Sequence, residues 1–394
     1  MSQSALRNRD YVIYLAGATI SLHGLWVYRV ALGWFAWELS ESELWVGIVA
    51  FTQFAPAVVF GPVFGVFADR FDRRVASILI NSLSLLNMLV LGVLTLLGYV
   101  DIRLLALLSL LQGTLDSAHA PVRMSIVPNL VNSDQLYSAI ALTSVSFNLS
   151  RFVGPALAGF VIALAGVGTA FVINGVSYLA MIIAMIVLRQ KPSAHSADRR
   201  KHPWVELLDG ARYALSHPLI RSLLVLAALG SVFGRGALEM MPAFADAIFG
   251  GGATALAGLT SAVGAGAVVA GIALSRGTRW LTTRVVRTGL IVAGLLVVSF
   301  GLLDRFEAAI IVAALLGVTL SICGVGSQIL LQARVDDELR GRVSSFWGMI
   351  VFGGTSLGSL AVGAAASVWG LQNAVVAAGV LCAGATVLTA RTAS

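Results

Sequence analysis

Long apolar stretches separated by short polar segments run along the whole sequence. Each stretch approaches or exceeds the roughly 20 residues that an α-helix needs to cross the hydrocarbon core of a bilayer. We therefore predict an all-α polytopic membrane protein with twelve transmembrane helices in two pseudo-symmetric six-helix bundles. The predicted helices cover residues 11–37, 45–68, 75–98, 104–127, 138–162, 167–188, 220–247, 253–275, 286–303, 308–330, 343–366 and 372–390.

The composition excludes several classes of protein. Hydrophobic residues make up 58% of the chain and charged residues 11%, whereas a soluble domain is nearer half apolar and a quarter charged. This argues against a soluble enzyme and a secreted domain. Cys323 and Cys382 both fall in apolar stretches, so no disulfide framework or metal site is implied. Because HExxH and Walker-type motifs are absent, we expect no enzyme activity, no cofactor and no ATP-driven transport.

The positive charges indicate how the helices are oriented. Of the 26 Lys and Arg residues, 20 fall on the side that holds both termini and every second loop, two on the other side and four within helices. This asymmetry follows the positive-inside rule and places both termini in the cytoplasm. The basic balance is therefore a topology signal, and we expect no nucleic-acid partner. The N-terminal apolar stretch lacks a cleavage site and is interpreted as the first transmembrane helix.

A polar segment divides the chain into two halves. We predict an N-terminal six-helix bundle over 1–188, a cytoplasmic linker over 189–219 and a C-terminal six-helix bundle over 220–394. Within the linker, residues 204–215 fit either a solvated connector or an amphipathic helix on the cytoplasmic face of the membrane.

The two halves also resemble one another. Residues 131–159 align without a gap to 335–363, at an offset of 204, so that the fifth helix matches the eleventh. In this alignment Gly154 meets Gly358 and Gly159 meets Gly363. Two parallel repeats of six helices are an architecture of alternating-access transporters.

The loop after the second predicted helix reads GPVFGVFADRFDRR. It resembles motif A of the major facilitator superfamily, G-x-x-x-D-R-x-x-R-R. The resemblance implies that Asp69 holds the cytoplasmic ends of the two halves together and releases them during transport. We assign Arg123, near the cytoplasmic end of the fourth helix, to the same gate. The matching residues are Gly65, Asp69, Arg70, Arg73 and Arg74.

The fifth helix carries SRFVGPALAG, which resembles motif C of that superfamily, a motif associated with exporters. Gly154 and Gly159 permit close packing, and Pro155 removes a backbone donor and bends the helix. Ser150 and Ala158 replace glycines of the motif.

Two other segments indicate one branch of this superfamily. ISLHGLWVYRVALGWFAWELSES and VELLDGARYALSHPLIRSLL are similar to the drug:proton antiporter branch that contains enterobactin exporters and macrolide efflux proteins. One departure concerns motif B, where many proton antiporters have an arginine four residues before a glycine of the fourth helix. Here Ser109 stands at that position, so coupling by that arginine is unsupported.

Ionisable groups at membrane depth are functional candidates because burying them is costly. Asp116, Glu239, His23 and His119 are the candidates for proton coupling, and Arg29, Arg151 and Arg235 are charge partners in the cavity. Asp116 can pair with Arg151, and Glu239 with Arg235 at i, i+4. A carboxylate that loses such a partner when the cavity changes sides can take up and release a proton. The alternative is that these groups only fix the packing of the helices.

Aromatic and sulfur-containing side chains adapt to varied apolar ligands. Together with the polar Gln112, they are the candidates for contact with substrate. They are Trp26, Trp34, Gln112, Phe147, Phe233, Met240, Met241 and Trp347.

Taken together, the patterns and the resemblance predict a proton-coupled antiporter of the bacterial inner membrane. It would export amphipathic small molecules by alternating access and act as a monomer. One alternative is a carrier for a single substrate, such as a siderophore, a metabolite or a lysophospholipid. Another is a membrane sensor on the same fold that transports nothing.

Overall fold

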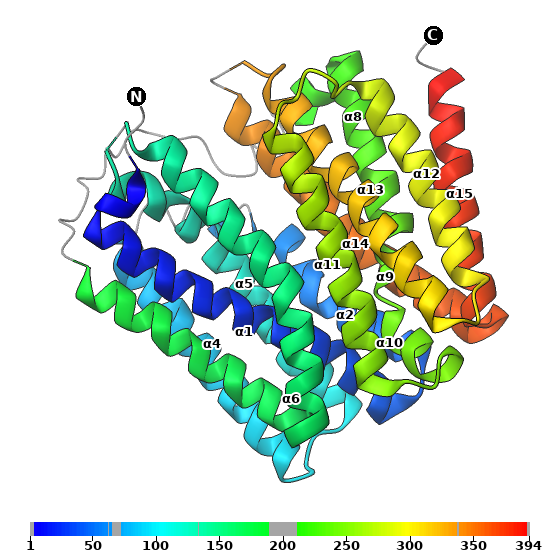
Figure 1. Ribbon diagram of the computed structural model, residues 1–394, viewed down its shortest axis with the longest axis horizontal. Helices are drawn as coiled ribbons and strands as arrows, with labels where there is room; N and C mark the ends of the chain where they lie inside the picture. The colour runs from blue at the N-terminus through cyan, green and yellow to red at the C-terminus, as the bar shows by residue number, and fades with distance from the viewer. Residues whose placement is uncertain are drawn as a thin grey trace.

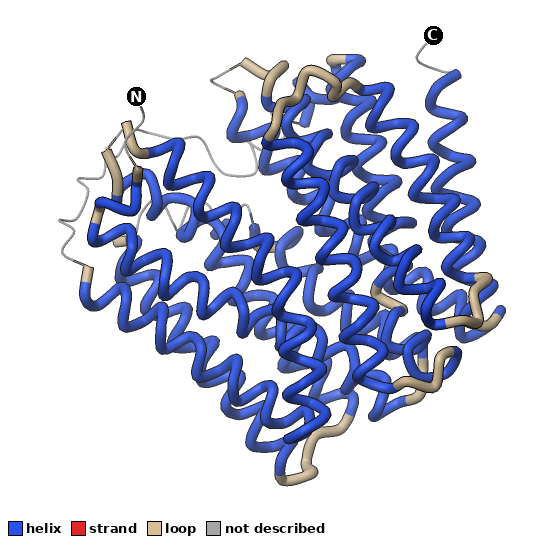
Figure 2. The backbone as a smooth tube through the Cα atoms, viewed as in Figure 1, coloured by secondary structure: helices blue, strands red, loops and turns tan. Residues whose placement is uncertain are grey.

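The computed structural model of the chain describes residues 4–61, 63–64, 72–132, 134–188, 211–336 and 339–391. Every regular element in these residues is helical, as Figure 2 shows. Nine of the described helices are long and apolar enough to cross a membrane, and a shorter apolar helix covers Glu43–Val59. The prediction of an all-α polytopic membrane protein is therefore confirmed.

The elements follow the predicted series closely. The long helix α6 contains Gly166, with φ 77° and ψ 171°, and is therefore two helices joined at a break. The bounds are η1 Ala5–Arg7, α1 Arg9–Ser40, α2 Glu43–Val59, α4 Arg73–Leu96, α5 Ile102–Leu130, α6 Leu136–Val187, α8 Pro218–Leu229, η2 Gly230–Arg235, α9 Gly236–Leu238, α10 Met241–Ala243, η3 Phe244–Ile248, α11 Gly252–Ser275, α12 Thr283–Gly301, α13 Phe306–Gln332, α14 Arg340–Trp369 and α15 Leu371–Arg391.

Polar side chains at the loop ends begin several of these helices. Asn8 accepts hydrogen bonds from two backbone N–H groups at the start of α1, and Asp72 does the same for α4. Asp101 and Thr282 cap α5 and α12 in the same way. These acceptors satisfy N–H groups that have no partner within the helix.

The segment Pro218–Ile248 crosses as one interrupted helix. It passes from α8 into the π-helix η2, through a turn at 239–240, and into a second π-helix, η3. Gly230, Gly234 and Gly236 loosen this part of the backbone, and Pro242 has no N–H to donate. Short π-helical turns are frequent at functional sites, which directs attention to Arg235 and Glu239 on this segment.

The internal repeat extends to the backbone conformation. Gly166 ends the fifth helix with φ 77°, and Gly370 ends the eleventh with φ 84°. The two positions are 204 residues apart, which is the offset of the sequence repeat. Positive φ is readily adopted by glycine and strained for other residues, so both halves turn at equivalent points by the same device.

The helices before the linker pack mainly on one another, as do the helices after it. α1 and α4 lie on α6, and α2 lies on α5, while α11 packs on α13 and α12 on α15. Two long contacts join these groups, α2 with α14 and α6 with α11 (Figure 1). The division into two six-helix domains stays a prediction. Of the linker, residues 189–210 lie outside the described residues, and 211–216 are helical.

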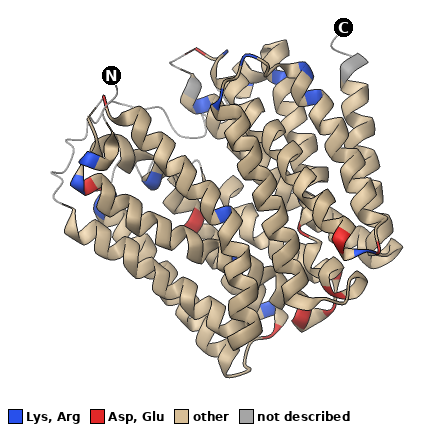
Figure 3. Cartoon of the chain, in the orientation of Figure 1, with Lys and Arg blue, Asp and Glu red and all other residues tan. Residues whose placement is uncertain are grey.

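Glycines allow the two groups to meet at backbone distance. A Cβ atom on Gly47 of α2 would lie 2.6 Å from the carbonyl oxygen of Ser359 in α14. A Cβ on Gly363 of α14 would lie 2.5 Å from the carbonyl oxygen of Glu43. These contacts lie at the end of the molecule opposite the two termini, which share one end in Figure 1. In Figure 3, Lys and Arg concentrate at the end with the termini.

Candidate functional site

Asp116 of α5 is held by a neighbour on its own helix. Gln112 Nε2 donates to Asp116 Oδ1 at 3.0 Å and lies 3.0 Å from the hydroxyl of Tyr178 in α6. The Gln112 Oε1 atom accepts a hydrogen bond from Asn87 of α4 at 3.2 Å. Gln112 is 0% exposed and therefore positions Asp116 from within the helix packing. Asp116 forms no ion pair with Arg151 in the described part of the chain, so the pairing considered from the sequence is absent.

The two histidine candidates lie in separate polar clusters. His119 Nε2 is 3.2 Å from Asn81 Nδ2 of α4. His23 Nδ1 lies 2.8 Å from the carbonyl oxygen of Thr19 and 3.0 Å from Ser150 Oγ of α6. Because the carbonyl can only accept, the Nδ1 atom of His23 carries the hydrogen.

The predicted ion pair between Arg235 and Glu239 is also absent from the described residues. The i, i+4 spacing aligns two side chains only on a regular α-helix. Arg235 instead ends the π-helix η2, and Glu239 lies in the turn after α9. The altered winding between them separates the two groups, although Arg235 still acts electrostatically on Glu239.

Arg29 of α1 is the charge shared by the two carboxylates. It is close enough to both Asp116 and Glu239 to interact with them electrostatically. It also lies within electrostatic reach of Arg151 and Arg235. All five side chains are partly accessible, and they come from helices of both halves. The described residues thus contain a central cluster of three arginines and two carboxylates.

Aromatic rings lie against two of these arginines. The guanidinium carbon of Arg29 is 4.9 Å from the ring centre of Trp26 and 5.6 Å from that of Phe54. Arg151 approaches the same Trp26 ring at 5.8 Å. Phe147 meets Trp26 edge to face at 6.2 Å. Trp26 and Phe147 are thus placed beside the charged cluster, and Phe54 is a neighbour that sequence reasoning missed.

A small cavity of about 20 Å³ lies beside Arg235 between α8, η2, α13 and α14. Ser231, Cys323 and Gly324 contribute to its lining. A Cβ on Gly324 would lie 2.9 Å from Arg235 Nη2, so the glycine leaves room for the guanidinium group.

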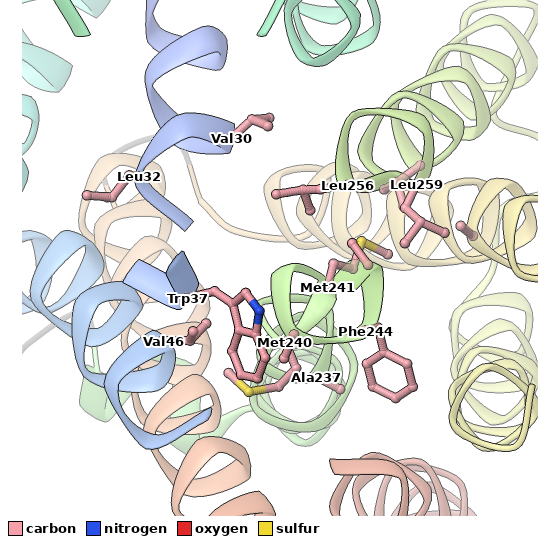
Figure 4. Packing of buried hydrophobic residues seen from close by; sticks show 14 of the residues in the cluster. Val30, Leu32, Trp37, Val46, Ala237, Met240, Met241, Phe244, Leu256 and Leu259 are labelled. Atoms are coloured by element: carbon pink, nitrogen blue, oxygen red, sulfur yellow. The ribbon is translucent and has the colours of Figure 1, made fainter. Parts of the chain in front are cut away.

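Met240 and Met241, two substrate candidates, are closely packed instead of lining an open space. They are 0% and 2% exposed and belong to an apolar cluster with residues from both halves. Figure 4 shows Trp37 of α1 beside Met240, with Val46 of α2 next to the Trp37 ring. Trp37 Nε1 also donates to Asp246 Oδ2 of η3 at 3.0 Å. These contacts seal the end of the molecule opposite the termini.

The other predicted residues are scattered. Trp34 and Phe233 pack at the edge of this apolar cluster, and Trp347 packs in a separate cluster with Tyr213 and Leu339. Within motif A, Arg74 donates to the carbonyl of Ile186, and Asp72 rather than a motif residue caps α4. Arg73 and Arg123 are partly buried. Gly65, Asp69 and Arg70 lie outside the described residues.

The motif C residues pack α6 against both halves. Gly154 meets the Trp26 side chain of α1, and Gly159 meets Ala257 of α11. The repeat partners behave alike, because Gly358 meets Val232 of η2 and Gly363 meets α2. Pro155 lies buried inside α6. The serine that replaces the first glycine of the motif, Ser150, contacts His23.

The sequence model of MFS_3, a family described as transmembrane secretion effectors, matches residues 2–393. The chain belongs to this family of the major facilitator superfamily. Family members and fold neighbours in these comparisons are transporters, so the prediction that the chain is not an enzyme is confirmed.

The relatives of this chain are named for several kinds of cargo. The chain is 24% identical to the staphyloferrin A transporter of Staphylococcus aureus, over 88% of this chain and 87% of that protein. It is 25% identical to the multidrug efflux pump Tap of Mycolicibacterium fortuitum, over 87% and 86%. It is also 25% identical to the enterobactin exporter EntS of Escherichia coli O1:K1 / APEC, over 76% and 71%. The predicted resemblance to this group is confirmed.

Solved structures share the fold. A bacterial homologue of the human lysosomal transporter Spinster, in an inward-facing and occupied conformation, superposes with a TM-score of 0.75. The identity is 16%, and the match covers 99% of this chain and 98% of that one. The nucleoside transporter NupG superposes with a TM-score of 0.72 at 14% identity, over 98% of each chain. The chain is thus a multi-pass membrane transporter of the major facilitator type.

Proposed function

We propose that this transporter is a proton-coupled exporter that moves amphipathic small molecules out of the bacterial cytoplasm. It acts as a monomer in the inner membrane, with both termini on the cytoplasmic side. The central cluster carries this proposal, because Asp116 and Glu239 come from different halves and share Arg29 as an electrostatic partner. A relative movement of the halves changes that arrangement, and a carboxylate released from a positive neighbour gains affinity for a proton.

Export is supported by the names of the relatives, which include an efflux pump and an exporter. The arrangement of the contacts agrees with it. The halves are in direct contact at the end opposite the termini, through the Trp37–Asp246 hydrogen bond, the apolar cluster around Met240 and the α2–α14 crossing. An exporter in this conformation loads its cargo from the side of the termini, which the positive-inside rule predicts to be cytoplasmic.

The test is a transport measurement on purified protein in liposomes, with an imposed pH gradient and a panel of candidate substrates. We expect substrate-dependent proton movement with the wild type and its loss with Asp116→Asn or Glu239→Gln. Glu307→Gln is the matched control, because this carboxylate is exposed at the start of α13. Substrate movement with no proton flux would contradict proton coupling, and no movement for any substrate would contradict a broad exporter.

A further inference from the structure

The central cluster has more positive than negative groups. Arg29, Arg151 and Arg235 are near Asp116 and Glu239, and none of the arginines forms an ion pair or hydrogen bond with another described residue. An arginine removed from bulk water is costly unless an anion or hydrogen-bond acceptors compensate it. With both carboxylates ionised the cluster retains one surplus positive charge, and protonation of either increases the surplus.

The same region also contains buried hydrogen-bond donors that have no partner among the described residues. Each guanidinium group has five N–H donors in a fixed planar arrangement. The Nε atom of Arg29 and the Nε1 atom of Trp26 are both buried without a hydrogen-bond partner among the described residues. A buried donor without a partner has a free-energy cost comparable to a lost hydrogen bond. A ligand that completes this site must therefore bring acceptor atoms.

The positions of the arginines suit a ligand held between the two halves. Arg29 of α1 and Arg235 of η2 are 206 residues apart. Trp26, three residues before Arg29, packs on Gly154. Val232, three residues before Arg235, packs in the same way on Gly358, the repeat partner of Gly154. Arg29 and Arg235 are thus equivalent positions in the first and seventh helices.

Apolar surface adjoins the charges. Trp26 lies against both Arg29 and Arg151, and the Phe54 ring lies 5.6 Å from Arg29. Phe54 also stacks with Phe352 of α14 at 6.5 Å, so the aromatic surface continues into the second half. A ligand with a planar or apolar body and a charged group at one end fits these surroundings.

We propose that the cargo of this transporter is an amphipathic oxyanion, whose carboxylate or related group binds Arg29, Arg151 and Arg235. Guanidinium groups bind such groups through paired N–H donors, which supply both affinity and orientation. The apolar body of the cargo packs against Trp26 and Phe54. This inference rests on the proposed transport function and adds the sign of the charge that the site accepts.

A matched set of fluorescent probes tests the sign of the charge. Dansylglycine carries a carboxylate, dansylcadaverine an ammonium group and dansylamide no charge, while all three share one aromatic body. Binding to the purified full-length protein in nanodiscs is followed by dansyl fluorescence. We expect dansylglycine to bind at least about tenfold more tightly than dansylcadaverine, which corresponds to about 1.4 kcal/mol.

Single substitutions then test whether the arginines of the central cluster cause the preference for the anionic probe. Arg29→Gln or Arg235→Gln is expected to weaken dansylglycine binding about tenfold and to leave dansylamide binding within about twofold. Retained dansylamide binding also shows that the variant is folded. Arg305→Gln is the matched control, because Arg305 is exposed before α13. Equal binding of the three probes, tighter binding of the cation, or unchanged binding by both variants would overturn the proposal.

Two sources can supply such an anion, a soluble metabolite or an anionic lipid. Nanodiscs of phosphatidylcholine with and without phosphatidylglycerol distinguish them. Displacement of dansylglycine by phosphatidylglycerol identifies a lipid, and undiminished binding identifies a soluble cargo; either result supports the oxyanion site. Because this assay measures binding alone, charge-selective binding without any transport in liposomes would refute the proposed export and leave the site intact.

Discussion

The indole N–H of Trp37 in α1 donates to the carboxylate of Asp246 in η3 at 3.0 Å, and this hydrogen bond joins the two halves of the chain. It lies next to the apolar cluster of Met240 and Val46, at the end opposite the termini. The bond must break when that end opens, so its strength contributes to the balance between the two conformations.

Loss of this bond should favour opening. A hydrogen bond to a charged group contributes about 1.5–3 kcal/mol, so Trp37→Phe is expected to shift the conformational balance by at least about tenfold. Asp246→Asn keeps an acceptor and should have a smaller effect. The measurement is the rate at which a membrane-impermeant maleimide labels Ala253→Cys, at the contact between α6 and α11. The native Cys323 and Cys382 are buried and give little background.

Trp280→Phe is the control for this prediction, because Trp280 is an exposed residue of the α11–α12 loop. Labelling of Ala253→Cys at the wild-type rate in both Trp37→Phe and Trp280→Phe would show that the hydrogen bond does not hold this end closed.

The crossing of α2 and α14 should be sensitive to a single methyl group. Gly363→Ala places a Cβ 2.5 Å from the backbone oxygen of Glu43, so we expect the free energy of unfolding to fall by roughly 1–3 kcal/mol. Gly348→Ala in the same helix meets open space and should stabilise α14 by up to about 1 kcal/mol. Thermal unfolding in one detergent compares the two variants. Equal melting temperatures would mean that the crossing is loose.

The serine that departs from motif C has a structural partner. Ser150→Ala removes the hydroxyl that lies 3.0 Å from His23 Nδ1 and is expected to cost about 1 kcal/mol of stability. Ser345→Ala removes an exposed hydroxyl that bonds only its own helix, and its effect should stay within about 0.5 kcal/mol. Chemical unfolding measures both values. A Ser150→Ala variant as stable as Ser345→Ala would contradict the role given to this contact.

Gln112 should matter for transport through Asp116. Gln112→Leu keeps a similar volume and removes the donor to the Asp116 carboxylate, so we expect transport to fall about tenfold or more. Gln372→Leu is the matched control, because Gln372 donates to the exposed Asp304 between α12 and α13. The variant pair is compared by initial transport rates in liposomes at equal protein content. Similar rates for the two variants would remove Gln112 from the transport site.

The helices could be predicted from the sequence because a bilayer demands long apolar segments, and the break at Gly166 agrees with a span boundary. From the sequence, the charged residues inside the membrane could be placed only by their depth along each helix. The predicted ion pair between Arg235 and Glu239 does not form, because the π-helix η2 changes the helical winding that the i, i+4 rule assumes. Gly230, Gly234, Gly236 and Pro242 are the sequence signals that could have indicated this interruption.

The polar neighbours of the site were also hidden from the sequence. Gln112 was expected to face substrate, but Asn87 and Tyr178 draw it into the packing between α4, α5 and α6. Such contacts depend on the rotation of each helix about its axis, which neighbouring helices determine. The sequence repeat, by contrast, extends to the backbone conformation. Gly166 and Gly370 are separated by the offset of the repeat, and both turn the backbone at positive φ.

The surplus of arginines in the central cluster has a consequence for energetics. Cargo that supplies the missing counter-charge carries that charge through the membrane field when the halves exchange positions. A potential of 100 mV is worth about 2.3 kcal/mol for each elementary charge that crosses. Over a complete cycle, an interior-negative membrane potential would drive both the exit of the anion and the entry of the proton, so that the exchange as a whole generates current.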